Sequence, residues 1–155
     1  MEQKTKVNAE AGKQEIVITR EFDLPLELLF KAYVEAEIVE QWMGTKVLLL
    51  ENKKHGSYGF ETRDPKGNVV FKANGVIHEF VPEQKITRTF EMERTAFDVQ
   101  LEFLEFEALT EGRSKLNMQV IYRSVALRDQ QLKLPFAMGI NMAHNRLQEV
   151  VNKLK

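Results

Sequence analysis

A long run of alternating apolar and polar residues, followed by one long amphipathic helix, constrains the fold of this chain more than any other feature. From His55 to Tyr122 the side chains alternate with the two-residue period of β-strands, interrupted by turn signals. The last segment then repeats apolar residues every three or four positions as far as Leu154. Antiparallel strands with helices segregated to one face define an α+β fold, and we predict that class here.

The remaining elements come before this run and share its short connections. A first strand is predicted over residues 14–23, and two short helical segments follow it, with Phe30 and Trp42 on their apolar sides and Gly44 ending the second. Further strands are predicted over residues 45–51, 57–63, 69–80, 85–93, 97–109 and 114–123. The apolar phase shifts between Phe103 and Leu104, which predicts a β-bulge there.

Pro135 interrupts the closing helical segment, because proline lacks an amide donor and disfavours helical geometry in the residue before it. We therefore predict a break, with residues 125–134 forming a separate turn or an irregular segment that can act as a lid. The main helix is expected to pack Ile140, Ala143, Leu147 and Val150 across the sheet.

The composition excludes several classes of function. The net charge of -1 gives no long-range attraction to nucleic acid, and no segment approaches the roughly 20 apolar residues of a membrane span. There is no cysteine, which excludes disulfides and thiolate metal sites and fits a reducing compartment. We expect a cytoplasmic monomer, with a flexible arm over residues 1–13 that lacks a secretion signal and a single domain over residues 14–155.

Acidic residues gather in the second half of the strand-rich region. We expect them on a solvated outer strand face, offset only by Arg94. They are Glu91, Glu93, Asp98, Glu102, Glu105, Glu107 and Glu111.

Several short motifs occur in an order that matches a known fold. They are Trp42-Met43-Gly44, Gly56-Ser57-Tyr58-Gly59-Phe60, the strand-centre Gly75, Val81-Pro82-Glu83, Met138-Gly139-Ile140-Asn141-Met142 and Arg146-Leu147. Together they resemble the helix-grip fold of the START/Bet v-like (SRPBCC) superfamily over residues 15–154. Within it the chain is similar to the Aha-type branch, which is named for the activator of the heat-shock chaperone's ATPase and so implies a link to the stress response.

The resemblance implies a hydrophobic cavity between the long helix and the concave sheet, used for apolar, aromatic or lipid-like small molecules. Strand alternation predicts which side chains share the concave face, and the helices add further candidates. Trp42 is interpreted either as a core anchor or as a wall at the cavity mouth. The predicted ligand-binding residues are Phe30, Trp42, Tyr58, Phe60, Phe71, Arg88, Phe90, Met92, Phe103, Met118, Tyr122, Gly139 and Met142.

Arg88 stands out because alternation turns its guanidinium inward with Phe90 and Met92. A buried charge is costly unless it is paired, so we expect a carboxylate partner such as Glu79, or a position at the rim. The alternative is that Arg88 is the counter-ion of an acidic ligand. The three histidines lie far apart in the sequence, and neither a hydrolase triad nor a nucleotide-binding motif occurs. We therefore predict no metal and no cofactor.

Three functions remain open. We favour a small-molecule binding module, because the pattern supplies a pocket without a matched acid and base. The second is a cyclase or hydratase that uses Arg88, Tyr58 or Tyr122 to polarise a ligand carbonyl. The third is a co-chaperone-like interaction module. A broad exposed apolar patch outside the pocket would favour this function.

Overall fold

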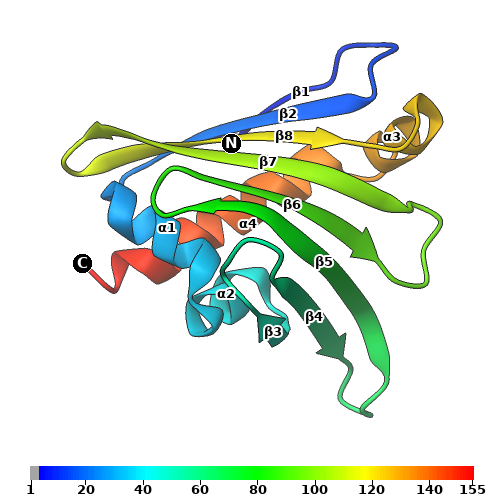
Figure 1. The fold of residues 1–155 in the computed structure, drawn as a ribbon, viewed down its shortest axis with the longest axis horizontal. Coiled ribbons are helices and arrows are strands. Elements are labelled where there is room, and N and C mark those ends of the chain that lie inside the picture. The colour runs from blue at the N-terminus through cyan, green and yellow to red at the C-terminus, as the bar shows by residue number, and fades with distance from the viewer. Residues whose placement is uncertain (1–3) are drawn as a thin grey trace.

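The alternating segments form the strands of one antiparallel sheet, which confirms the predicted α+β class. The computed structural model describes residues 4–155. The strands are β1 (Lys6–Asn8), β2 (Glu15–Phe22), β3 (Lys46–Leu50), β4 (Ser57–Arg63), β5 (Val69–Val81), β6 (Lys85–Met92), β7 (Val99–Thr110) and β8 (Arg113–Ile121). Within the described residues these eight strands are ordered β1-β2-β8-β7-β6-β5-β4-β3 across the sheet (Figure 1).

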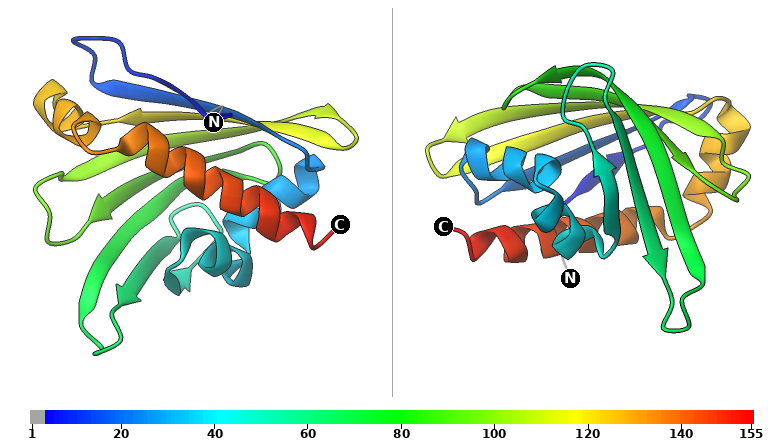
Figure 2. Two further views of the ribbon diagram at one scale, coloured as in Figure 1. Left: turned by 180° about the vertical axis from the view of Figure 1, so that it is seen from behind. Right: turned by 60° about the horizontal axis from the view of Figure 1, so that its bottom comes forward.

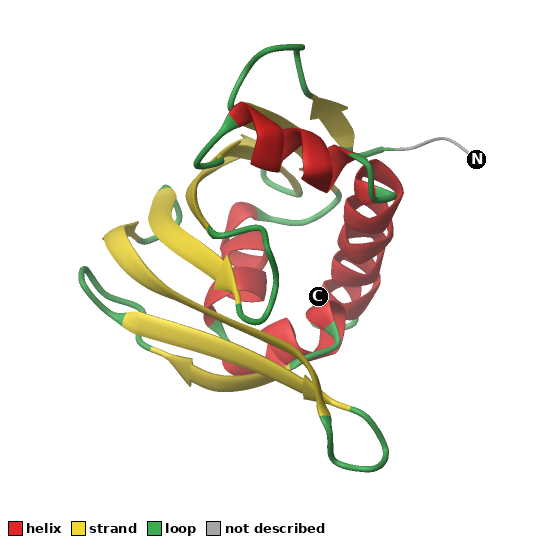
Figure 3. Cartoon of the chain, turned by 90° about the vertical axis from the view of Figure 1, so that its right-hand side faces the viewer, coloured by secondary structure: helices red, strands yellow, loops and turns green. Residues whose placement is uncertain are grey.

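The helices lie on one side of the sheet. They are α1 (Leu26–Val34), α2 (Ala36–Met43), α3 (Val125–Leu132) and α4 (Phe136–Asn152). The long helix α4 crosses the sheet beside α1 and α2 (Figure 2), and Figure 3 shows the sheet curving around the helices. Pro135 separates α3 from α4, as predicted. Gly44 ends α2 with a left-handed φ of 67°, a conformation that costs glycine little.

The pairing of β2, the first long strand, with β8, the last strand, brings the two ends of the chain together in the sheet. Ile18 lies opposite Met118 in this pairing, and both side chains point toward the helices and are buried. Leu147 on α4 is fully buried against the same core. The hydrophobic core therefore joins residues from both ends of the chain.

The N-terminal segment contains an edge strand that the sequence analysis missed. β1 pairs with β2, and Thr5 just before it is buried. The Thr5 amide donates to Asn141 Oδ1 at 3.1 Å, and the Thr5 hydroxyl lies 2.8 Å from His144 Nδ1. Both partners lie on α4, so these polar contacts tie the segment to the long helix.

The buried face of α4 differs from the predicted one. Its buried residues are Asn141, His144, Leu147 and Val151, whereas Ile140, Ala143 and Val150 lie beside them and are only partly buried. Two polar residues thus occupy the centre of this face. Burial, and to a smaller extent the charge of Arg20, lowers the pKa of His144 to about 3, so the ring is neutral in the folded protein at neutral pH.

Two predictions about β7 are wrong: the bulge near Phe103 and the solvated position of Glu102. Asp98 has a left-handed φ of 64°, and the strand begins after it. Its pairing with β6 then runs without a shift from Val99 to Glu105, so the bulge predicted near Phe103 is wrong; the pairing with β8 shifts only between Ala108 and Thr110. In this register Glu102 points toward the helices and is buried, against the prediction of a solvated face.

Candidate functional site

The concave face of the sheet carries a buried ion pair at its centre. Arg88 on β6 lies directly opposite Glu102 on β7, and its Nε donates to Glu102 Oε1 at 3.0 Å. Gln100 Nε2 donates to the other carboxylate oxygen at 2.8 Å. The side chains of Arg88 and Glu102 are only 11% and 8% exposed. Arg88 is therefore paired as expected, but with Glu102 rather than Glu79, which instead binds Lys85 and Thr87.

Tyr58 lies across the sheet next to this pair, and Gly75 makes room for it. The two residues face each other on β4 and β5, and a Cβ added at Gly75 would overlap the Tyr58 ring and the Thr89 carbonyl oxygen. The ring therefore crosses over Gly75, and its hydroxyl donates to that carbonyl oxygen on β6. The Arg88 guanidinium lies 5.0 Å from the ring centroid, a favourable cation–π distance.

The protonation states follow from this burial. Burial raises the pKa of Tyr58, Tyr33 and Tyr122 above the ordinary value, so all three stay protonated at neutral pH. Burial alone lowers the pKa of Arg88, but the oxygens of Tyr58 and Glu102 outweigh this effect and raise it. The site thus holds neutral phenols and an internally neutralised ion pair, with both oxygens of its carboxylate engaged.

The concave face is sealed at one end and partly open at the other. Near α1, the inward residues Ile86, Leu104 and Phe106 are buried, and Phe106 packs edge-on against Phe30 and Tyr33. Toward the opposite ends of the same strands, the inward side chains keep part of their exposure although they point the same way. These are Phe71, Phe90, Met92 and Gln100. We call these four residues the open end.

The predicted lining residues fall into three groups. Phe30, Trp42, Tyr58, Phe60, Met118 and Tyr122 are buried in the core, and Phe71, Arg88, Phe90 and Met92 lie on the concave face with partial exposure. Trp42 donates to the Ala32 carbonyl oxygen at 2.7 Å and packs on Tyr33, which supports the core-anchor interpretation.

The third group does not reach this face. Phe103 lies on the convex side of the sheet, opposite Thr87 and Gln119, because the predicted bulge is absent. Gly139 and Met142 are exposed on α4, where a Cβ at Gly139 would meet nothing within 4 Å. The predictions that placed these three residues at a cavity wall are therefore wrong in position.

The sequence analysis also missed two residues of the site, Glu102 and Gln100. One signal could have found Glu102: an inward Arg88 needs an acceptor, and the neighbouring strand offers a carboxylate only if its inward phase includes Glu102.

The hollows of the described surface lie mostly elsewhere. One of about 120 Å³ includes Phe71 and Met92 of the open end, together with Arg94 and Thr95. A larger one of about 540 Å³ lies at the β1–β2–β8 edge and is polar. The candidate site is therefore a partly exposed apolar face that borders a small hollow.

The described residues contain neither a metal-ligand cluster nor a membrane-spanning helix. Among residues 4–155, no group of three or more acidic or histidine side chains is arranged to hold a metal ion. No helix in the same range has the length and apolar character needed to cross a membrane.

The comparisons with known proteins agree on the fold. Residues 23–152 match the family described as Activator of Hsp90 ATPase homolog 1-like protein. A crystal structure of a Rhodobacter sphaeroides protein has a TM-score of 0.85 at 17% identity, covering 96% of this chain and 99% of that one. A solution structure of an Arthrobacter aurescens protein has a TM-score of 0.83 at 14% identity, covering 96% and 91%. No curated protein matches the sequence significantly. At such identities the structural matches establish the fold alone.

Proposed function

This chain belongs to the family of Activator of Hsp90 ATPase homolog 1-like proteins, and on that premise we propose that it binds an apolar or aromatic small molecule at the open end of its concave face. The observation that carries the proposal is the partial exposure of Phe71, Phe90 and Met92, which point to the same side as the fully packed core. Inward apolar side chains that the protein leaves uncovered are available to an apolar ligand.

The chemistry around these residues favours a neutral ligand. Arg88 already has Glu102 as its counter-ion, so an incoming carboxylate gains little electrostatic stabilisation from Arg88. The carboxylate also loses its hydration when it enters the site, which costs free energy. Glu102 accepts from both Arg88 and Gln100 and is not free to act as a general base. Binding is therefore supported better than acid–base catalysis.

The test compares two phenylalanines on neighbouring strands that face opposite sides of the sheet. Phe90 lies at the open end, and Phe103 lies on the convex side; both are partly buried. We expect 1-decanol to bind the wild type at least as tightly as decanoate, measured by NMR titration. Phe90→Ala should weaken decanol binding by about tenfold, since a lost aromatic contact is worth about 1–2 kcal/mol, and Phe103→Ala should leave it unchanged.

Three outcomes would refute this assignment. The first is the absence of saturable binding of either probe, and the second is an equal loss in both variants. The third is a marked preference for decanoate that Arg88→Met abolishes, because it would make Arg88 the counter-ion of an acidic ligand.

A second candidate is a protein-interaction role, which one observation favours. Met138 and Met142 lie one turn apart on the outer side of α4 and are 57% and 52% exposed, and Leu134 just before the helix is 47% exposed. Such residues suit a protein contact. Titration of purified Hsp90 with the wild type and with Met138→Ser/Met142→Ser, followed by calorimetry, tests this role. Equal binding heats for the two proteins, or no binding heat, would exclude a role of these two methionines in an Hsp90 contact.

A further inference from the structure

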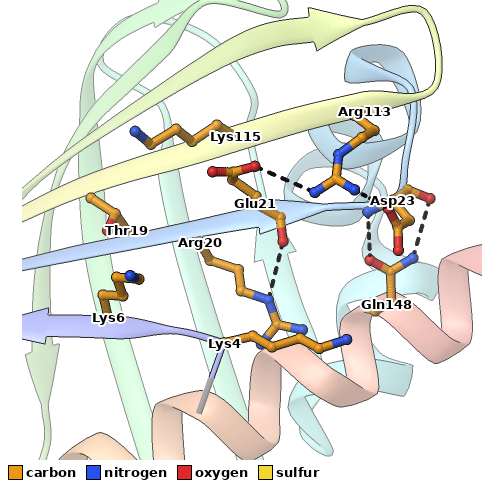
Figure 4. Close-up of a pocket in the computed structure, with 9 residues that line it drawn as sticks. All are labelled: Lys4, Lys6, Thr19, Arg20, Glu21, Asp23, Arg113, Lys115 and Gln148. Atoms are coloured by element: carbon orange, nitrogen blue, oxygen red, sulfur yellow. Dashed lines mark hydrogen bonds and ion pairs between the residues drawn. The ribbon is translucent and has the colours of Figure 1, made fainter. Parts of the chain in front are cut away.

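A second site is indicated by the polar cleft of about 540 Å³ where β1, β2 and β8 approach the C-terminal half of α4 (Figure 4). Its lining includes five cationic side chains and two carboxylates, although the whole chain carries a net charge of -1. The cationic residues are Lys4, Lys6, Arg20, Arg113 and Lys115.

The two carboxylates of the cleft do not neutralise the lysines. Arg113 binds both, with its guanidinium 3.3 Å from Glu21 Oε1 and 2.9 Å from Asp23 Oδ1. Within residues 4–155, none of the three lysines of the cleft takes part in an ion pair. These lysines therefore have no carboxylate within ion-pair distance among the described residues, although Lys115 lies opposite Glu21 on β2 and Glu107 on β7 in the sheet register.

Arg20 gives the cleft a donor that buried contacts hold in place, including the Phe22 ring, whose centroid lies 5.1 Å from the guanidinium carbon. Arg20 is 3% exposed, and its partners are neutral: Nη1 donates to Thr5 Oγ1 at 3.0 Å and to Asn141 Oδ1 at 3.4 Å, and Nε donates to the Glu21 carbonyl oxygen at 3.3 Å. Nη2 has no hydrogen-bond partner among the described residues, and no carboxylate there pairs with this guanidinium. Burial lowers the pKa of Arg20, and Asp23 only partly offsets the effect.

A buried guanidinium without a counter-ion is costly unless an anion completes it. We propose that this cleft binds the phosphate groups of a small soluble molecule, with Arg20 as the fixed donor on the inward side of β2 and Lys4 as a further cation. Lys6 and Lys115 lie on the outward face of the sheet with Thr19 and Glu21 and extend the cationic lining there. Phosphate fits better than a carboxylate, because its two charges and three terminal oxygens can engage several cations at once. The volume leaves room for the rest of a phosphorylated molecule. This site is separate from the open end and does not depend on the function proposed there.

The experiment uses inorganic pyrophosphate as the probe, followed by calorimetry and by amide shifts along residues 19–23. The test variant is Lys6→Gln/Lys115→Gln, which keeps the buried Arg20 network intact. The matched control is Lys53→Gln/Lys54→Gln, which removes the same charge from an exposed turn outside the cleft. We expect saturable binding with shifts at residues 19–23, weakened about tenfold in the test variant and unchanged in the control.

A vesicle experiment distinguishes a soluble phosphate from a lipid headgroup, and a single variant replaces the double variant if the latter does not fold. Vesicles of phosphatidylcholine with phosphatidic acid should bind no better than phosphatidylcholine alone; binding to the acidic vesicles without binding of pyrophosphate would overturn the soluble ligand. If the double variant does not fold, Lys6→Gln alone serves with the same readout. Absent pyrophosphate binding, or an equal loss in test and control variants, would overturn the site.

Discussion

Arg88 and Glu102 neutralise each other inside the protein, and this mutual dependence predicts the effect of changing either one. Arg88→Met leaves the Glu102 carboxylate buried without its cation, which should cost about 3–5 kcal/mol of unfolding free energy. Arg88→Met/Glu102→Leu removes both charges and should recover most of the loss, ending within about 1 kcal/mol of the wild type or above it. Urea unfolding of the three proteins checks this; a single variant as stable as the wild type would disprove the buried pair.

Glycine is required at position 75 because the Tyr58 ring packs against it, not because of its backbone conformation. A side chain there would collide with the Tyr58 ring and the Thr89 carbonyl oxygen, so Gly75→Ala should destabilise the protein by about 1–3 kcal/mol through overpacking. Gly59 on β4 is the control, since a Cβ there meets the Ala73 carbonyl oxygen at an ordinary 3.6 Å. Urea midpoints that fall equally for Gly75→Ala and Gly59→Ala would argue against the Tyr58 explanation.

At the scale of elements, α4 is attached to the core by one of its faces. Leu147 is fully buried, whereas Met142 on the same helix is 52% exposed. Leu147→Asp buries an unpaired charge and should cost on the order of 3 kcal/mol or more, while Met142→Asp should change the stability by less than about 0.5 kcal/mol. Chemical denaturation of both variants measures the difference, and similar losses would contradict the assigned face.

The segment just before β1 is joined to α4 by the contact between Thr5 and His144, and the burial of His144 predicts a dependence of stability on pH. The folded-state pKa of about 3 lies below the ordinary value near 6.5, so the unfolded chain takes up a proton first as the pH falls. The stability contribution is complete above pH 6.5 and is lost progressively down to pH 3.

Between pH 7 and pH 5 the wild type should therefore lose about 2 kcal/mol through this group, and His144→Gln should lose correspondingly less. Urea unfolding at both pH values gives the comparison. Identical losses in the two proteins would show that His144 is not buried neutral.

The elements show where sequence patterns suffice. The alternation of apolar and polar residues correctly predicted that Tyr58, Phe60 and Arg88 point inward, because each lies in a strand whose opposite face is polar. It failed on β7, where both phases carry apolar residues and the true inward phase includes Glu102. A carboxylate becomes acceptable there only through Arg88 on the next strand, which is a pairwise property that one strand's pattern does not contain.

The same reasoning explains the rotated face of α4. Asn141 and His144 count as polar in any periodicity, yet they are buried because Thr5 contacts both. Their partner lies more than 130 residues away in the sequence. Three-residue strands such as β1 carry too little alternation to be recognised, so this partnership was not predictable from either segment.

For the whole molecule, the order of elements was sufficient to predict the α+β class, the motif resemblance added the helix-grip fold, and β2–β8 pairing completes the sheet. The content of the site depends on how tightly α4 and the sheet pack, which the order does not specify. Tyr58, Phe60 and Trp42 are buried in the core between the sheet and the helices, whereas the inward apolar residues at the open end keep part of their exposure.

The most direct test of this account is NMR of the methionine methyl groups during titration with 1-decanol. The chain has six methionines; Met92 lies at the open end, and Met138 and Met142 lie on the outer side of α4. We predict a saturable shift of the Met92 methyl signal and no shift of the Met138 and Met142 signals. Shifts of Met138 and Met142 with a stationary Met92 would contradict it and place the binding surface on the outside of the long helix.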